Sequence, residues 1–167
     1  LVPNLKWNNL TDENVTSPDL EAMAERMLST PEKVNSRFFA WFHFVDPHDQ
    51  YVPHAGIGPY GRSLRDRYDA EVTFTDQYIG KLLSFIDKQP WASRTFIVVT
   101  GDHGESLFDD GTLSHWGRLS EFQCRTPLAI VGPGFESAQI NNATTHADVL
   151  PTIVHALCGE HVALVCA

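Results

Sequence analysis

Apolar residues recur every three or four positions in two stretches of the chain, and this spacing predicts two amphipathic helices. The first runs from about Ser17, its cap, to Leu28, with Pro18 in its first turn. The second runs from Arg65 to Asp87, with an apolar stripe on one face and charges on the other. A third helix is expected from near Asp148 to Gly159, because Pro151 suits a first turn and glycine often ends a helix.

Three shorter runs of apolar or β-branched residues predict buried strands. They cover residues 38–45, 95–100 and 128–131. Because the predicted strands alternate with the predicted helices, we expect an α/β fold with a mainly parallel sheet.

Two of these strands run directly into polar loops. Asp46-Pro47-His48-Asp49 follows the first, and Gly101-Asp102-His103-Gly104-Glu105 follows the second. Ligands of such sheets bind beyond the carboxyl ends of the strands. Both loops are therefore candidate sites.

The composition is that of one ordinary globular domain, with 167 residues of which 43% are hydrophobic. The net charge of -9 argues against a nucleic-acid surface, which needs clustered Lys and Arg. No run of 18 apolar residues predicts a membrane-spanning helix, and the first residues show no targeting signal. Cys124, Cys158 and Cys166 form no disulfide framework, whereas eight histidines hint at metal chemistry.

Asp102 and His103 lie between two glycines at the end of a predicted strand. The glycines permit tight backbone geometry, so that both side chains can turn toward one point. A carboxylate oxygen and an imidazole nitrogen suit a divalent cation. The simpler alternative is that Asp102 caps a following turn and that His103 is incidental. The pattern alone leaves both alternatives open.

Three further histidines have a structural and a chemical interpretation. His43 lies inside an apolar run, which favours a buried, hydrogen-bonded core residue. His48 in the following loop either contacts an anionic substrate as a proton donor or is merely exposed. His115 follows His103 by 12 residues, and the loop between them is long enough to fold back over the same strand edge. The alternative for His115 is an ordinary surface loop.

The remaining candidates flank the third strand and the last helix. His146 either supports a site or only packs, and Asp148 is most simply a helix N-cap. Arg125 can pair with an anion or with one of the many acids. The sequence contains no GxSxG, Walker-type, HExxH or Gly-rich dinucleotide motif.

Taken in order, these segments resemble the sulfatase family of the alkaline phosphatase superfamily. One match is the strand and loop that end in Pro47-His48-x-x-Tyr51, and another is Asp102-His103-Gly104-Glu105, which resembles the Asp-(Asn/His)-Gly-Glu metal loop. The other matching segments are residues 67–72, 75–80, 125–128, 132–134 and 146–152. Their shared order and spacing are specific, and they cover roughly residues 38–159.

The resemblance implies part of an alkaline-phosphatase-like α/β/α sandwich with a mainly parallel sheet. It implies that Asp102 and His103 are ligands of a divalent metal ion, Ca²⁺ in a sulfatase and Zn²⁺ or Mn²⁺ in a phosphotransferase relative. In the family, a metal-bound nucleophile attacks the ester sulfur or phosphorus, and the cation neutralises the developing charge.

The same resemblance assigns roles to four other residues. His48 would contact the ester and protonate the leaving oxygen, and His115 would lie on the substrate side of the site. We therefore take His48 and His115 as catalytic candidates, and His43 and Arg118 as substrate-binding candidates.

Two features depart from the family pattern. Nothing matches the Cys/Ser-x-Pro-x-Arg element of sulfatases or the acidic metal pair before it. Residues 1–167 are therefore expected to be one partial catalytic domain without the N-terminal, nucleophile-bearing part, and to bind metal poorly and turn over nothing alone. Trp116 stands where many sulfatases have Gly, and a Trp-Gly step occurs in related membrane phosphotransferases.

Three hypotheses of function follow. The first is a sulfuric ester hydrolase, and the second is a phosphodiesterase or a phosphoethanolamine or phosphoglycerol transferase. The third is a non-catalytic remnant that acts as a binding or structural module. The expected partners are a small sulfated or phosphorylated substrate and the N-terminal half of the domain, with no nucleic acid. The family resemblance suggests a periplasmic or extracellular location.

Overall fold

The structure is a computed structural model that describes residues 15–48, 50–58, 60–116 and 118–158. Asp49, Gly159 and Cys166, which entered the sequence predictions, lie outside these ranges. The chain forms two compact units, each assembled from segments that are separated in the sequence. Unit 1 comprises residues 1–90 and 103–125, and unit 2 comprises residues 91–102 and 126–167.

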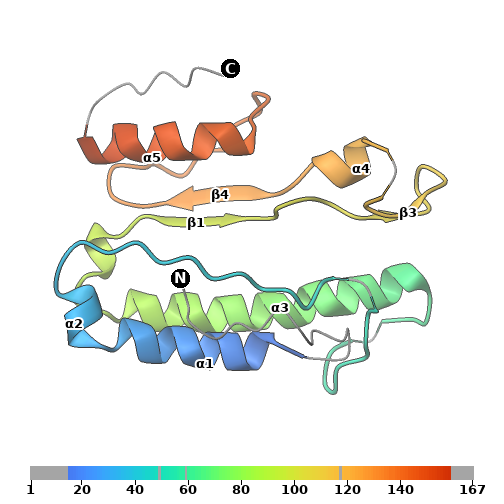
Figure 1. The fold of residues 1–167 in the computed structure, drawn as a ribbon, viewed down its shortest axis with the longest axis horizontal. Coiled ribbons are helices and arrows are strands. Elements are labelled where there is room, and N and C mark those ends of the chain that lie inside the picture. Colours follow the sequence, from blue (N-terminus) through green and yellow to red (C-terminus); the bar gives the residue numbers. More distant parts are fainter. Residues whose placement is uncertain (1–14, 49, 59, 117, 159–167) are drawn as a thin grey trace. The chain divides into compact units, whose positions relative to one another are not determined.

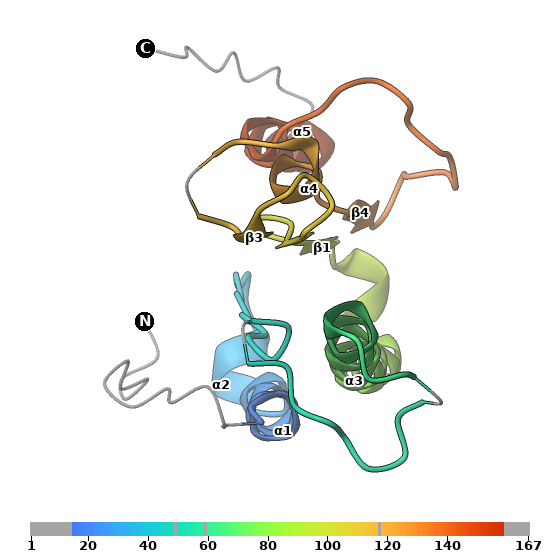
Figure 2. The same cartoon turned by 90° about the vertical axis from the view of Figure 1, so that its right-hand side faces the viewer.

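Unit 1 is built on two helices that lie side by side, α1 (Ser17–Leu28) and α3 (Leu64–Asp87) (Figures 1 and 2). The short helix α2 (Pro31–Val34) follows α1. The two long helices bury one apolar stripe each, which contributes Ala24, Leu28, Leu82 and Ile86 to the core. Both were predicted to within one residue of their observed bounds, because a helical hydrophobic repeat is a local signal.

The start of α1 is capped by a residue far along the chain. The backbone N–H groups of Thr16 and Ser17 each donate to the Asp46 carboxylate at 2.6 Å, and the Ser17 hydroxyl donates to the same group. Thr16 holds the N-cap position without a side-chain cap bond of its own. The prediction that Ser17 caps this helix is therefore wrong. Asp46 instead supplies the acceptors and the negative charge that a helix N-terminus needs.

Residues 38–45 are the clearest departure from the sequence predictions. The segment is not assigned as a strand, and the side chains of Phe39 and Trp41 are 86% and 71% exposed. His43 is exposed as well, so the prediction of a buried core histidine is wrong. A buried strand needs ladder partners and covered faces. Within the described part of unit 1, strand pairing is limited to the short hairpin β2–β3.

Unit 2 contains a two-stranded antiparallel sheet. The 3-10 helix η2 (Ala92–Arg94) leads into β1 (Ile97–Thr100), which pairs with β4 (Leu128–Val131) so that Ile97 faces Val131. Both strands were predicted, although β1 begins two residues late and the pairing is antiparallel rather than parallel. The structure thus confirms a mixture of helices and strands, while the mainly parallel sandwich stays a prediction.

A single turn of 3-10 helix, η3 (His146–Asp148), opens into the last helix, α5 (Val149–Cys158). Thr145 is the capping residue, since its hydroxyl accepts from the Ala147 N–H at 3.2 Å. In return the Asp148 carboxylate accepts from the Thr145 N–H at 2.7 Å. The helical turn therefore starts earlier than predicted, and Asp148 is the capping-box partner rather than the cap.

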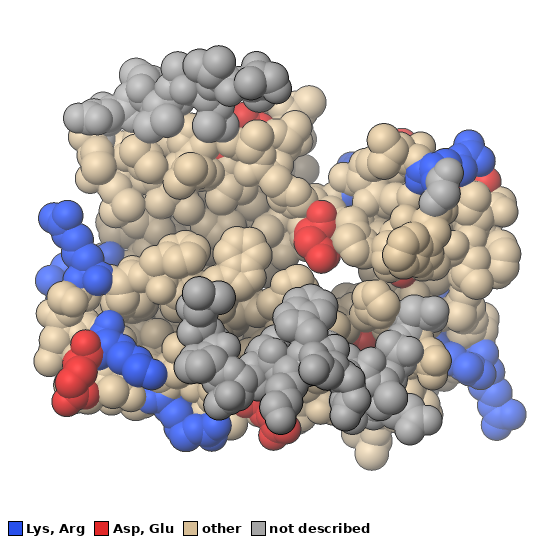
Figure 3. All heavy atoms as spheres, viewed as in Figure 1, with Lys and Arg blue, Asp and Glu red and all other residues tan. Residues whose placement is uncertain are grey.

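On one face of the molecule, the described charged side chains are dispersed. Figure 3 shows one face, where the described Lys and Arg side chains project singly or in small groups between uncharged areas. Among the described residues, no helix is both long and apolar enough to cross a membrane.

A buried carboxylate ties the loop after His48 to α3. Glu71 is 2% exposed, and its two oxygens accept from the Val52 N–H at 2.7 Å and from His54 Nε2 at 2.6 Å. The His54 ring also stacks on Phe74 with centroids 3.7 Å apart. Burial raises the pKa of Glu71 above its ordinary value, although the hydrogen bonds from His54 and Val52 act in the opposite direction.

Replacing Asp46 by Ala should lower the free energy of unfolding by about 1 kcal/mol, because two backbone donors of α1 lose their acceptor. Urea denaturation followed by circular dichroism measures the change. Asp46→Asn keeps one acceptor oxygen and should lose less. Asp76→Ala, at an exposed position of α3, is the matched control. Equal stabilities of Asp46→Ala and the unmodified chain would refute the cap.

Glu71→Gln should change how stability depends on pH. The folded pKa of Glu71 lies above its ordinary value of 4.5, so between these two values the folded state keeps a proton that the unfolded state has released. The free energy of unfolding therefore falls as pH rises through this window. The variant cannot ionise, so its stability deficit relative to the unmodified chain should narrow with rising pH. Denaturation at a series of pH values tests this, with the exposed Glu136→Gln as control. A deficit that widens with pH would contradict it.

Candidate active site

The site is built around a tight hairpin that folds the chain back on itself. Strands β2 (Ser106–Leu107) and β3 (Leu113–Ser114) pair antiparallel. Between them, one Asp110 oxygen accepts from the Ser106 hydroxyl at 2.6 Å and from the Thr112 N–H at 3.0 Å. Hydrogen bonds from the Ser106 and Thr112 hydroxyls hold the pKa of Asp110 far below its ordinary value. The hairpin therefore returns the chain to where it started, as the loop length predicted.

Ser114, directly before His115, has a backbone φ of 67°. This left-handed conformation is uncommon for residues other than glycine and carries a cost in backbone energy. The surrounding hairpin holds it in place, since Ser114 is paired opposite Ser106. The strained residue thus sits at the point where the chain leaves β3 and presents the His115 ring.

Gly104, directly after His103, is required for packing. Its N–H donates to the Gln123 carbonyl at 2.7 Å, within the short helix α4 (Glu121–Cys124). A Cβ at this position would lie 2.1 Å from the Phe122 carbonyl oxygen, which is closer than any real side chain approaches. The glycine therefore lets α4 press against the backbone beside His103.

Three of the predicted site histidines come together in unit 1. The His115 ring centroid lies 4.2 Å from that of His103 and 5.6 Å from that of His48. The Trp116 ring also stacks on the His115 ring, with centroids 5.3 Å apart. His48 and His103 are exposed, whereas the His115 side chain is 17% exposed. His115 is thus the centre of the cluster, and its neighbours border it toward solvent.

Glu105 is the acidic member of this cluster. Its side chain is 6% exposed, and its Oε2 atom lies 3.3 Å from His115 Nδ1. Its other oxygen, Oε1, is buried with no hydrogen-bond partner in the described structure. The sequence analysis placed Glu105 in a motif but gave it no role. The available signal was its position two residues after His103, on the same loop.

His103 has the chemistry of a metal ligand. Its Nδ1 lies 2.9 Å from the Gly104 carbonyl oxygen, which can only accept, so Nδ1 carries the hydrogen. The Nε2 atom then has the lone pair, and metal-binding histidines are commonly held in this way by a backbone carbonyl. Asp102, its exposed neighbour in the sequence, belongs to unit 2. The described residues contain no group of three or more His, Cys, Asp or Glu side chains arranged to hold a metal ion.

The two predicted substrate-binding residues are exposed. His43 lies on the extended segment before Asp46, and Arg118 lies three residues beyond His115. Their roles toward a substrate stay predictions. Arg125, the other basic candidate, forms an exposed ion pair with Glu121 at 3.2 Å and one helical turn away. Of the two alternatives for Arg125, the structure therefore shows pairing with an acid.

His146 braces the end of β1 within unit 2. Its Nε2 lies 2.8 Å from the Gly101 carbonyl oxygen, and the hydroxyls of Thr100 and Thr126 lie 3.4 Å from the same nitrogen. Because a carbonyl oxygen only accepts, His146 Nε2 donates to it. The contact fixes the backbone immediately before Asp102, while a role of His146 in supporting a site stays a prediction.

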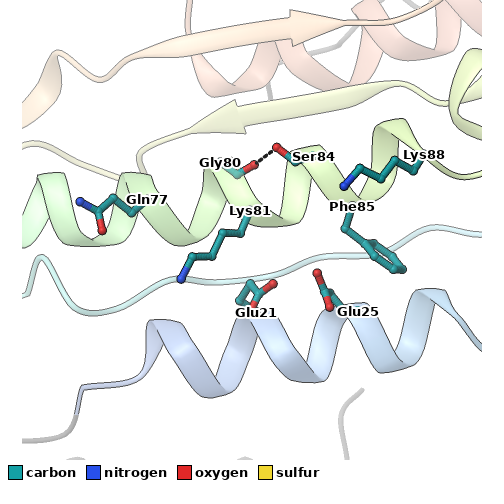
Figure 4. A pocket seen from close by; sticks show the side chains of 8 residues that line it. All are labelled: Glu21, Glu25, Gln77, Gly80, Lys81, Ser84, Phe85 and Lys88. Atoms are coloured by element: carbon teal, nitrogen blue, oxygen red, sulfur yellow. Dashed lines mark hydrogen bonds between the residues drawn. The ribbon is translucent and has the colours of Figure 1, made fainter.

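A hollow of unit 1 lies between α1 and α3, and the predicted site residues do not line it. Figure 4 shows Glu21 and Glu25 on α1 facing Lys81 and Lys88 on α3. Burial raises the pKa of Glu21, and its hydrogen bond with Glu25 acts in the same direction. The opposed acids and lysines fit two packed amphipathic helices rather than a reaction site.

Comparison with known proteins connects this arrangement to one family. The family model described as Sulfatase matches residues 4–159. Choline-sulfatase of Rhizobium meliloti is 30% identical over 94 residues, which are 55% of this chain and 18% of that protein. Human iduronate 2-sulfatase is 36% identical over 85 residues, which are 46% of this chain and 15% of that protein.

A third relative is the multifunctional alkaline phosphatase superfamily protein PehA of Trinickia caryophylli. It is 33% identical over 102 residues, which are 59% of this chain and 20% of that protein. The chain thus spans a fifth or less of the length of these curated relatives. No solved structure matches the chain.

His146→Ala should loosen the end of β1, because the Gly101 carbonyl loses its donor. We expect a loss of about 1 kcal/mol in the free energy of unfolding of this region. Hydrogen exchange of the β1 and β4 amides measures it. His146→Gln, which keeps a donor, should exchange more slowly than His146→Ala. Unchanged protection in His146→Ala would show that the contact contributes nothing.

Proposed function

The chain belongs to the sulfatase family, and from this premise we propose that it contributes to the metal-dependent hydrolysis of a sulfate ester. The observation that carries the proposal is the clustering of the His48 and His103 rings around the ring of His115. The relatives include a choline-sulfatase and an iduronate 2-sulfatase. The substrate of this chain is proposed only as a class, a small sulfated molecule.

We assign the proton-transfer chemistry to His48 and His115. An imidazole contacts an anionic ester group favourably when protonated, and it can deliver that proton to the departing oxygen. His48 is exposed and can reach a bound ester, whereas His115 is held from behind by Glu105 and Trp116. His48 therefore suits the donor of the proton, and His115 suits a fixed contact to the ester.

We assign the metal to Asp102 and His103, which are adjacent in the sequence. The hydrogen bond of His103 Nδ1 to the Gly104 carbonyl leaves Nε2 with the lone pair that a cation needs. When bound, the cation would neutralise negative charge that develops on the ester oxygens. Ca²⁺ is the ion expected in a sulfatase, and the imidazole ligand keeps Zn²⁺ or Mn²⁺ as alternatives.

His43 and Arg118 are proposed to bind the substrate. Both are exposed, and an imidazole and a guanidinium can each donate hydrogen bonds to an anionic group. We also propose that the protein acts outside the cytosol, in keeping with a relative whose name describes an extracellular sulfatase.

A phosphate ester is the second candidate substrate class. The sequence step Trp116-Gly117 favours it, because a Trp-Gly step at this point resembles phosphotransferase relatives. The name of PehA, a multifunctional protein of the alkaline phosphatase superfamily, also fits a broader range of esters. The identity of the nucleophile separates the two classes. The sequence of 167 residues contains no Cys/Ser-x-Pro-x-Arg element that would supply a formylglycine.

The assay uses the protein encoded by the whole reading frame that contains this sequence. We expect release of sulfate from 4-nitrophenyl sulfate, and a fall in kcat/KM of about 10²- to 10⁴-fold in His48→Ala. His155→Ala, on the exposed side of α5, is the matched control and should keep full activity. Removal of metal with EDTA should abolish turnover, and Ca²⁺ should restore it.

Other outcomes of the same assay decide between the hypotheses. Phosphate release from 4-nitrophenyl phosphate or its diester, with no sulfate release, would replace the sulfatase by the phosphate-ester hypothesis. No turnover of either substrate in the presence of Ca²⁺, Zn²⁺ or Mn²⁺ would favour a non-catalytic module. Restoration by Zn²⁺ or Mn²⁺ but not by Ca²⁺ would correct the metal.

A further inference from the structure

We propose that Glu105 is a positioning residue that fixes the ring orientation and the tautomer of His115. The inference rests on the proposed function, because His115 is the histidine to which we assigned a fixed contact with the ester. It concerns geometry alone: Glu105 holds the hydrogen on Nδ1 of His115, so that Nε2 is the nitrogen left for the ester, with a lone pair in the neutral ring and a hydrogen in the protonated ring.

The contact that carries the proposal joins two shielded groups. Glu105 Oε2 lies 3.3 Å from His115 Nδ1, and the two side chains are 6% and 17% exposed. An ionised carboxylate can only accept a hydrogen bond, so the imidazole donates through Nδ1. Shielding from water strengthens this interaction relative to a similar pair at the surface.

Glu105 has no other explanation among the contacts that the structure describes. Burying a carboxylate is costly unless it is paired, and Oε1 is buried without a partner. A residue retained only for packing would be expected to be apolar here. The hydrogen bond to His115 is therefore the contact that offsets the burial.

The neighbours of His115 explain why its orientation needs fixing. The ring is flanked by those of His48, His103 and Trp116, and none of these contacts distinguishes Nδ1 from Nε2. The Ser114 hydroxyl lies 3.4 Å from Nδ1, but a hydroxyl can donate or accept and so accepts either tautomer. A 180° turn of the ring would exchange the two nitrogens. Glu105 is the one described neighbour that favours a single arrangement.

The test reads the tautomer of His115 directly by long-range ¹H–¹⁵N NMR on ¹⁵N-histidine-labelled protein. The spectra are recorded at about pH 8.5, where an ordinary imidazole is neutral. We expect the Nδ1–H tautomer in the unmodified chain. Glu105→Gln keeps an acceptor oxygen but adds an amide donor, so it should weaken this preference less than Glu105→Leu does. Glu105→Leu removes the acceptor and should shift His115 toward the Nε2–H tautomer or a mixture. Glu121→Gln, exposed on α4, is the matched control.

Two results would overturn the proposal. One is an Nε2–H tautomer of His115 in the unmodified protein, which needs no variant to fold. The other is an unchanged Nδ1–H tautomer in Glu105→Leu. If Glu105→Leu does not fold, Glu105→Asp serves instead. Its side chain is one methylene shorter, so the carboxylate moves away from Nδ1 and His115 should shift toward the Nε2–H tautomer in the same way.

Activity distinguishes this proposal from the proposed function. In the active protein, Glu105→Leu should lower kcat by about 10- to 100-fold with a smaller change in KM, and Glu105→Gln should recover most of it. A tautomer shift as expected, in a protein that hydrolyses no sulfate ester, would leave the positioning role intact while refuting the sulfatase. Sulfate hydrolysis that is insensitive to Glu105→Leu would refute the positioning role alone.

Discussion

The carboxylate of Asp46 at the start of α1 is the interaction on which the arrangement of unit 1 depends. It joins two segments about thirty residues apart, and it attaches the chain just before Pro47 and His48 to the first turn of α1. The next residues are then held by Glu71 on α3, through Val52 and His54. His48 is therefore restrained on both sides, by the helix-capping carboxylate of Asp46 before it and the buried carboxylate of Glu71 after it. These contacts hold the loop that carries His48 beside the His115 ring.

Carboxylates and imidazoles recur as partners in this unit, but in two different settings. Glu71 and His54 form a buried pair that fastens a loop to a helix. Glu105 and His115 form a looser pair at 3.3 Å whose imidazole faces other rings and is partly accessible. The first pair is closed by a second hydrogen bond and by stacking on Phe74, whereas the second leaves one carboxylate oxygen unsatisfied. A buried carboxylate oxygen without a hydrogen-bond partner is more typical of a functional site than of a purely structural ion pair.

The sequence predicted what depends on neighbouring residues and failed where distant segments meet. The periodicity of α1 and α3 placed both helices, and the loop length between His103 and His115 predicted their return to one place. The apolar run at 38–45 was taken for a central strand, yet Phe39 and Trp41 are exposed, because strand pairing depends on partners that a local pattern does not contain. The Asp46 cap was missed for the same reason. Glu105 was missed because a buried acid and an exposed acid look alike in a sequence.

The contact between Gly104 and α4 changes what a comparison of related sequences can teach. Since a Cβ at this position would collide with the Phe122 carbonyl, selection against every other residue would act through the packing of a neighbouring helix. An invariant glycine in this loop would then reflect the packing of α4, so its invariance alone would not indicate metal chemistry. Relatives that lose α4 should be free to replace the glycine and still keep the histidine before it. The two positions can therefore evolve independently, even though they are neighbours in the chain.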